Sequence, residues 1–101
     1  MTPVPGGVTA PEGFRSAAVH CGIKAAAGAL DLAIIAADAS VPAAGIFTTN
    51  LAQAAPVLVS KRHLSASGGM ARAIVVNSGC ANACTGDRGM SDAVRMAADV
   101  A

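Results

Sequence analysis

The segment Asn77–Gly86 contains the residues of this sequence that are best suited to chemistry. It is rich in glycine, asparagine and small hydroxyl residues, and glycine lets a substrate approach the backbone closely. Thr85 and Gly86 are adjacent, so a hydroxyl and a backbone N–H are available to one oxygen atom. Two such donors stabilise the oxyanion that develops during acyl transfer. We therefore take Thr85 and Gly86 as candidate oxyanion-hole donors.

The same pattern also has structural and simpler binding interpretations. Loops of Gly, Asn and Ser often connect a strand to a helix, with their side chains bonded to local backbone. Phosphate binding is less favoured, because neither G-x-x-x-x-G-K-[ST] nor G-x-G-x-x-G occurs. Ser78 lacks the G-x-S-x-G elbow of a hydrolase nucleophile. The residue types alone leave a catalytic, an anion-binding and a purely structural turn open.

The segments on either side predict the elements that must position this turn. Residues 71–77 are nearly continuous in apolar residues toward their end, as in a strand that is covered on both faces. From Met90 onward, apolar residues recur at intervals of three and four, which is typical of one helical face. We expect Ser91 and Asp92 to cap the first turn of this helix.

Apolar and β-branched runs predict further elements upstream, so the expected fold class is α/β. Strands are expected at 14–23, 30–36 and 43–49, a turn at 38–42, and an apolar run at 56–60 closed by a helical turn at 61–65. Residues 1–12, with three prolines and a Gly pair, predict an irregular leader before a domain over 13–101.

Composition and charge exclude several classes of protein. A hydrophobic fraction of 53% with 13% charged residues excludes a disordered chain. The net charge of +1, without a basic stripe, argues against nucleic-acid binding. No apolar run approaches the ~20 residues that span a bilayer. Only two residues are aromatic, so the core is expected to be thin, and no helix stop signal follows Ala101. We expect an incomplete chain.

Three cysteines and two histidines are candidate metal ligands or catalytic bases. Cys21, Cys80 and Cys84 accompany an N-terminus without a secretory signal, which predicts reduced thiols and a cytoplasmic protein. Their spacing does not supply the four convergent ligands of a structural metal site, so no metal is expected. We interpret them as small buried thiols. His20 is expected to be a satisfied strand histidine, and His63 a solvated residue near a helix end.

Several segments together resemble the ornithine acetyltransferase (glutamate N-acetyltransferase) family of arginine biosynthesis. The resemblance covers nearly the whole chain from Gly13 onward. Its elements are Gly22–Lys24, Asp31–Ala33, Ala43–Asn50, Ala54–Val57, Val75–Gly79 and Ala81–Gly86. Cys80 stands where many family members carry Asn. We expect that difference to alter local hydrogen bonding without abolishing activity.

The resemblance implies a layered αββα sandwich, of which residues 13–101 form the N-terminal part of the α chain. Family members cut themselves before a Thr, which becomes the nucleophile of the β chain in an α2β2 heterotetramer. This Thr carries acetyl from N-acetylornithine to glutamate; some members also accept acetyl-CoA, and no cofactor is implied. Thr85 and Gly86 would form the oxyanion hole.

No Ala–Thr pair occurs in the sequence, so the nucleophile is expected elsewhere in a longer precursor. We therefore expect this chain alone to be inactive. Two alternatives stay open at this point. One is a related self-processing aminopeptidase, and the other is a non-catalytic α/β domain that binds small anions.

Overall fold

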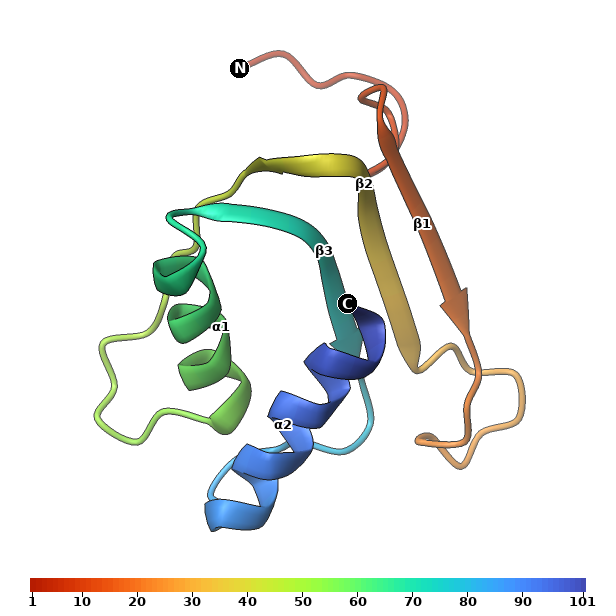
Figure 1. The fold of residues 1–101 in the computed structure, drawn as a ribbon. Coiled ribbons are helices and arrows are strands. Elements are labelled where there is room, and N and C mark those ends of the chain that lie inside the picture. The colour runs from red at the N-terminus through yellow and green to blue at the C-terminus, as the bar shows by residue number, and fades with distance from the viewer. The chain divides into compact units, whose positions relative to one another are not determined.

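The computed structural model describes residues 1–101 and combines strands with helices (Figure 1). Along the chain the elements are β1 (Phe14–Val19), β2 (Leu32–Pro42), α1 (Ala55–Ala66), β3 (Met70–Asn77) and α2 (Gly86–Val100). Residues 1–13 contain neither helix nor strand. The predicted α/β class is confirmed.

The three strands form one sheet in the order β1-β2-β3. β1 is antiparallel to β2, with Phe14 opposite Ala37 and Val19 opposite Leu32. β3 also runs antiparallel to β2, as the bonds flanking the two strands show. Before β2, the carbonyl of Asp31 accepts the N–H of Ser78, which follows β3; after β2, the N–H of Ala43 donates to Gly69, which precedes β3. β2 is therefore the central strand.

The chain forms two compact units. The first comprises Met1–Ser40 and Arg72–Gly79, and the second comprises Val41–Ala71 and Cys80–Ala101. β1 belongs to the first unit, and both helices belong to the second. The Asn77–Gly86 turn therefore passes from the first unit to the second between Gly79 and Cys80.

β2 is longer than the sequence predicted, and β1 is shorter. The predicted turn at 38–42 is wrong, because β2 continues through Pro42. Pro42 is the last residue of the strand, so its missing N–H removes a possible ladder bond only at the strand's end. β1 ends at Val19, so the predicted strand at 14–23 is correct only in its first part.

The predicted strand at 43–49 is also wrong, because these residues form no strand. Side chains there bond to the local backbone instead: Asn50 N–H donates to the Thr48 hydroxyl oxygen, and Ala52 N–H donates to the Asn50 amide oxygen. Such bonds compete with a strand ladder. Ile46, which supplied much of the apolar pattern, is fully exposed.

The apolar run at 56–60 and the predicted helical turn after it form one helix, α1. Pro56 lies in its first turn, where the missing N–H has no intrahelical acceptor to lose. The helix ends at Ala66, and Ser67–Gly69 follow it; Gly68 and Gly69 have φ of 64° and 79°, and Gly69 N–H donates to the Leu64 carbonyl oxygen. His63 lies exposed in the last turn, as predicted.

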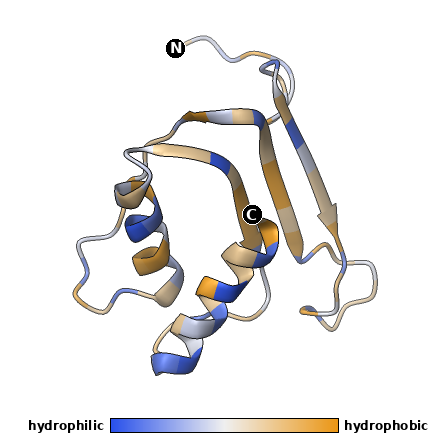
Figure 2. Cartoon of the chain, in the orientation of Figure 1, coloured by the Kyte–Doolittle hydropathy of each residue, from blue (hydrophilic) through white to orange (hydrophobic).

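α2 packs against α1 through a small apolar cluster. Ala93 of α2 joins Ala55 and Val59 of α1, and Met90 covers this group. Met90 and Ala93 of the predicted face are therefore confirmed as packing residues, whereas Val94 is 43% exposed. Polar and apolar colours alternate along α2 in Figure 2. Neither helix has the length and apolar character needed to cross a membrane.

β3 is formed as predicted, but its surroundings differ. Ile74 and Val76 are 58% and 50% exposed, so this strand is not covered on both faces in this chain. Figure 2 shows apolar character along the sheet strands, most clearly in the first half of β2. Since the core side chains are mainly Ala and Val, little apolar area is removed from water, as the composition predicted.

Candidate active-site turn

The second half of the turn enters α2 through unusual backbone conformations. Cys84 is the only non-glycine residue with positive φ (56°), and Gly86 follows with φ of 63°. Between them, Thr85 has φ −100° and ψ 2°, in the sparsely populated bridge region. Gly86 meets the need for positive φ without the penalty a side chain brings. Backbone outliers of this kind gather at functional sites.

Backbone donors at the start of α2 are free. Along α2, the first backbone N–H that has an acceptor is that of Gly89, which donates to the Thr85 carbonyl oxygen at 3.4 Å. The N–H groups of Gly86, Asp87 and Arg88 have no acceptor in the chain. A helix N-terminus favours negative charge there. Gly86, predicted as an oxyanion donor, is exposed and has its N–H available.

The other predicted donor, Thr85, already has a partner. Its hydroxyl donates to the side-chain oxygen of Asn82, and the Asn82 amide donates to Gly89 O at 2.7 Å. All three residues belong to the second unit. Thr85 is the N-cap residue of α2, but its side chain makes no capping bond. The predicted capping by Ser91 and Asp92 is wrong, because α2 begins at Gly86 and places them in its second turn.

The first half of the turn rests on the loop that follows β1. Ser78 N–H donates to Asp31 O at 2.9 Å. Gly79 has φ of 111°, and a Cβ atom built there would lie 2.7 Å from Lys24 Cγ and 3.3 Å from Ile23 Cγ2. Contact this close leaves no space for a side chain at Gly79. The segments Gly22–Lys24 and Val75–Gly79 therefore meet in space.

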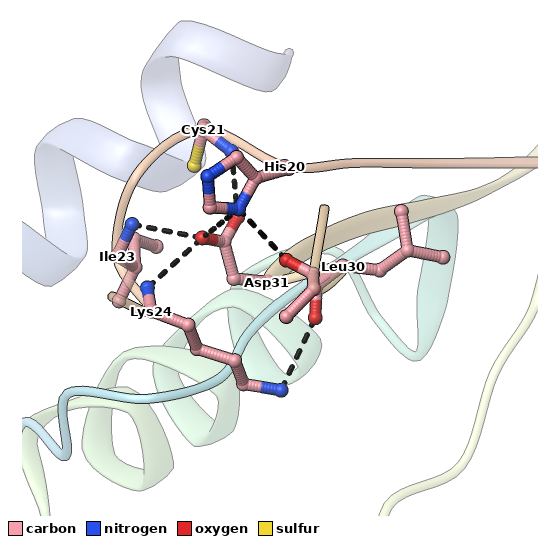
Figure 3. A network of polar contacts seen from close by, with 7 residues as sticks. His20, Cys21, Ile23, Lys24, Leu30 and Asp31 are labelled. Carbon is pink, nitrogen blue, oxygen red and sulfur yellow. Dashed lines mark hydrogen bonds and ion pairs between the residues drawn. The ribbon is translucent and has the colours of Figure 1, made fainter. Parts of the chain in front are cut away.

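Asp31 holds this loop together (Figure 3). Its side chain is buried, and its carboxylate accepts backbone N–H bonds from Cys21 at 2.7 Å, Ile23 at 2.8 Å and Lys24 at 3.0 Å. Bonds to the charged form favour ionisation, so they hold the pKa of Asp31 far below its ordinary value of 3.8. We define Asp31 and the bonded residues 21–24 as the Asp31 knot.

His20 adds to the Asp31 knot from just beyond β1. Its Nδ1 lies 2.8 Å from Ala29 O and 3.3 Å from the Asp31 carboxylate. The ring is therefore satisfied by partners, as predicted, although it follows the strand and does not lie in it. Lys24 Nζ closes the loop by donating to Leu30 O at 3.1 Å.

The cysteines lie on loops and turns, and all three are exposed. The prediction of buried thiols is wrong, because none of them falls on a strand or on the inner face of a helix. Cys21 belongs to the Asp31 knot, to which it donates its backbone N–H. A hydrogen bond to the Asp31 carboxylate, with smaller effects from burial and from the negative charge, raises the pKa of Cys21 above its ordinary value of 9.0. Its reactive thiolate form is therefore disfavoured.

Comparison of this chain with known proteins identifies its family. The ArgJ family profile matches residues 15–101. The chain belongs to the ArgJ family. Over 92 residues it is 52% identical to the arginine biosynthesis bifunctional protein ArgJ of Dehalococcoides mccartyi, covering 90% of this chain and 22% of that protein. Over 98 residues it is 49% identical to the chloroplastic ArgJ of Oryza sativa subsp. japonica, covering 97% and 21%.

Solved structures agree with this membership. The ArgJ crystal structure from Bacillus halodurans superposes with a TM-score of 0.86 at 41% identity, covering 92% of this chain and 47% of that one. Ornithine acetyltransferase from Mycobacterium tuberculosis, complexed with ornithine, gives 0.82 at 51% identity, covering 90% and 46%. The chain thus spans about a fifth of the length of its curated relatives, as the coverages of 22% and 21% state. The family predicted from the motifs is confirmed.

Proposed function

We propose that the full protein containing these residues is a glutamate N-acetyltransferase that moves an acetyl group from N-acetylornithine to glutamate. The observation that carries the proposal is the 51% identity, with a TM-score of 0.82, to an ornithine acetyltransferase crystallised with ornithine. Ornithine is the product left when N-acetylornithine gives up its acetyl group. A protein of this family therefore binds the deacetylated partner of the proposed donor.

The proposed reaction has two balanced acyl-transfer steps. A Thr hydroxyl outside residues 1–101 attacks the acetyl carbonyl; its proton passes through the Thr α-amino group to ornithine, which leaves as the C–N bond breaks. The amine of glutamate then attacks the acetyl-Thr ester, so that N-acetylglutamate is released and the hydroxyl is restored. Each step passes through a tetrahedral intermediate with a negatively charged oxygen.

In this proposal, Thr85 and Gly86 bind that oxygen. The unpaired Gly86 N–H at the start of α2 supports the assignment, since it is exposed and lies where negative charge is favoured. The Thr85 hydroxyl can turn from Asn82 to the oxyanion by rotation about its Cβ–Oγ1 bond. A charged acceptor forms a stronger hydrogen bond than the neutral Asn82 amide does.

The proposal includes self-cleavage before the nucleophilic Thr and assembly of the two chains as an α2β2 heterotetramer. Exposed apolar side chains on the sheet, including Ile74 and Val76, support a role for further protein surface in covering it. Mass spectrometry of the full-length product tests the cleavage. Two chains are expected, the second beginning with Thr; a single uncleaved and active chain would contradict this part.

Acetyl transfer is tested with isotope-labelled N-acetylornithine and glutamate, with N-acetylglutamate detected by mass spectrometry. We expect turnover by the full protein and none by residues 1–101 alone. Acetyl-CoA replaces N-acetylornithine in a parallel reaction to identify the second donor. A folded full-length protein that transfers no acetyl group would contradict the proposal. Release of N-terminal residues from peptides would instead favour the aminopeptidase alternative.

A further inference from the structure

We infer that Asn82 is a positioning residue for Thr85: it holds the Thr85 hydroxyl beside Gly89 and keeps it from capping its own helix. The inference rests on the proposed oxyanion role of Thr85 and deepens it. The three residues Asn82, Thr85 and Gly89 are called the Asn82 clamp below.

The Asn82 amide is oriented by its second partner. Because its nitrogen donates to Gly89 O at 2.7 Å, its oxygen is turned toward Thr85, whose hydroxyl it accepts. An amide bonded at both ends cannot flip without losing both bonds. Asn82 is half-buried, whereas Thr85 is exposed, so the more enclosed residue fixes the more accessible one.

Gly89 provides the space for this arrangement. A Cβ atom at Gly89 would overlap the Thr85 hydroxyl and the Asn82 side-chain oxygen. Gly89 is buried and has no positive φ, so backbone conformation does not explain the glycine. Glycine is less favourable than Ala in a helix, and here the space of the missing side chain is filled by the Thr85 hydroxyl.

The clamp also explains why Thr85 does not act as an ordinary N-cap. A Thr in this position normally accepts the N–H of the second or third helical residue. Here those residues are Asp87 and Arg88, and neither N–H is accepted by the Thr85 side chain. Asn82 thereby leaves the donors at the start of α2 available to a ligand.

Without Asn82, Thr85 is free to turn inward and cap α2. Its oxygen would then lie over the Asp87 or Arg88 N–H, away from the position beside Gly89. The helix would keep its stability, but the acyl-transfer oxyanion would lose a well-placed donor. A purely structural role for Asn82 predicts the opposite combination, in which stability and activity fall together.

The decisive experiment compares Asn82→Ala, Thr85→Ala and the double variant in the full-length enzyme. We expect Asn82→Ala to lower kcat by roughly 10-fold with KM nearly unchanged, because misplacing a catalytic group by about 1 Å costs up to ~10²-fold. Thr85→Ala should lower kcat by ~10²-fold or more, because it removes one of the two proposed oxyanion donors. The double variant should be no slower than Thr85→Ala alone, since Asn82 acts only through Thr85.

Ser91→Ala serves as the matched control, because Ser91 is an exposed residue of the same helix and should leave kcat unchanged. The role of Asn82 is overturned if the fold-decreases in kcat of the two single variants multiply in the double variant. It is also overturned if Asn82→Ala has the wild-type kcat. Wild-type activity in Thr85→Ala overturns the proposed oxyanion hole instead, so the two failures are distinguishable.

Gly89→Ala keeps the test decisive if Asn82→Ala does not fold. Alanine favours the helix but fills the space of the Thr85 hydroxyl. We expect kcat to fall roughly 10-fold, as for Asn82→Ala, while circular dichroism shows the helix content and the thermal midpoint of the wild type. An unchanged kcat in Gly89→Ala contradicts the clamp.

Discussion

Asp31 binds Ser78 through its backbone, with the Ser78 N–H 2.9 Å from the Asp31 carbonyl oxygen. The same residue holds residues 21–24 through its carboxylate. One residue therefore fixes both the loop after β1 and the start of the candidate active-site turn. A substitution of Asp31 should disturb the loop after β1 and, through it, the position of the candidate active-site turn.

Asp31→Asn should lower the thermal midpoint of the full-length protein at pH 7. The amide replaces one acceptor oxygen with an NH₂ group, which then faces backbone N–H donors. Circular dichroism melts measure the change. Asp38→Asn is the control: Asp38 pairs with Arg15 at 3.2 Å but both side chains are largely exposed, so less than about 1 kcal/mol is expected. Equal midpoints for Asp31→Asn and wild type would contradict the structural role of Asp31.

The contribution of Asp31 should also depend on pH. Its pKa is lowered in the folded protein, so the folded state favours the ionised form. This stabilisation is fully present above the ordinary pKa of 3.8 and is lost as the pH falls toward the depressed folded value. The difference in midpoint between wild type and Asp31→Asn should be constant from about pH 6 to 8 and shrink below about pH 4. A difference that grows on acidification would show that another group is responsible.

Gly79→Ala should destabilise the protein by about 1–3 kcal/mol, because it forces a side chain into positive φ and against Lys24. Urea denaturation of the full-length protein gives the free energy of unfolding. Gly7→Ala is the matched substitution, since a Cβ atom there meets nothing within 4 Å and φ is not positive. The same effect from both substitutions would mean that contact with Lys24 does not constrain Gly79.

Cys21 should be alkylated more slowly than a free thiol at pH 8. Its raised pKa leaves less of the reactive thiolate, although the residue is exposed. The measurement uses iodoacetamide on the Cys80→Ser, Cys84→Ser variant, with any other cysteines of the full protein resolved by peptide mass spectrometry. Glutathione is the reference. A rate equal to or above that of glutathione would contradict the predicted influence of Asp31 on Cys21.

Local sequence pattern was sufficient for the elements that flank the turn. β3 has a nearly continuous apolar run and α2 has apolar residues at intervals of three and four, and both elements formed where these patterns predicted them. Residues 43–49 had a similar apolar content but form no strand, because strand formation depends on a pairing partner that the local pattern does not contain. α1 was divided wrongly, since a short apolar run does not distinguish a strand from a buried helix.

Contacts between residues far apart in the chain could not be predicted from local sequence pattern. Gly22–Lys24 and Asp31 were noticed as separate motifs, but their union depends on a loop that folds back onto a buried carboxylate. Asn82 looked like an ordinary turn residue. Its signal was present only in combination, as an Asn three residues before a Thr and seven before a glycine inside a helix.

The order β1-β2-β3 leaves two edges of the sheet without a neighbouring strand. Unpaired N–H and C=O groups on such edges attract other chains, particularly where apolar side chains such as Ile74 and Val76 are exposed nearby. Residues 1–101 produced alone should therefore self-associate at high concentration. The yield and solubility of that piece would then report the self-association of its sheet edges. The folding of the full-length protein would have to be measured on the full-length protein itself.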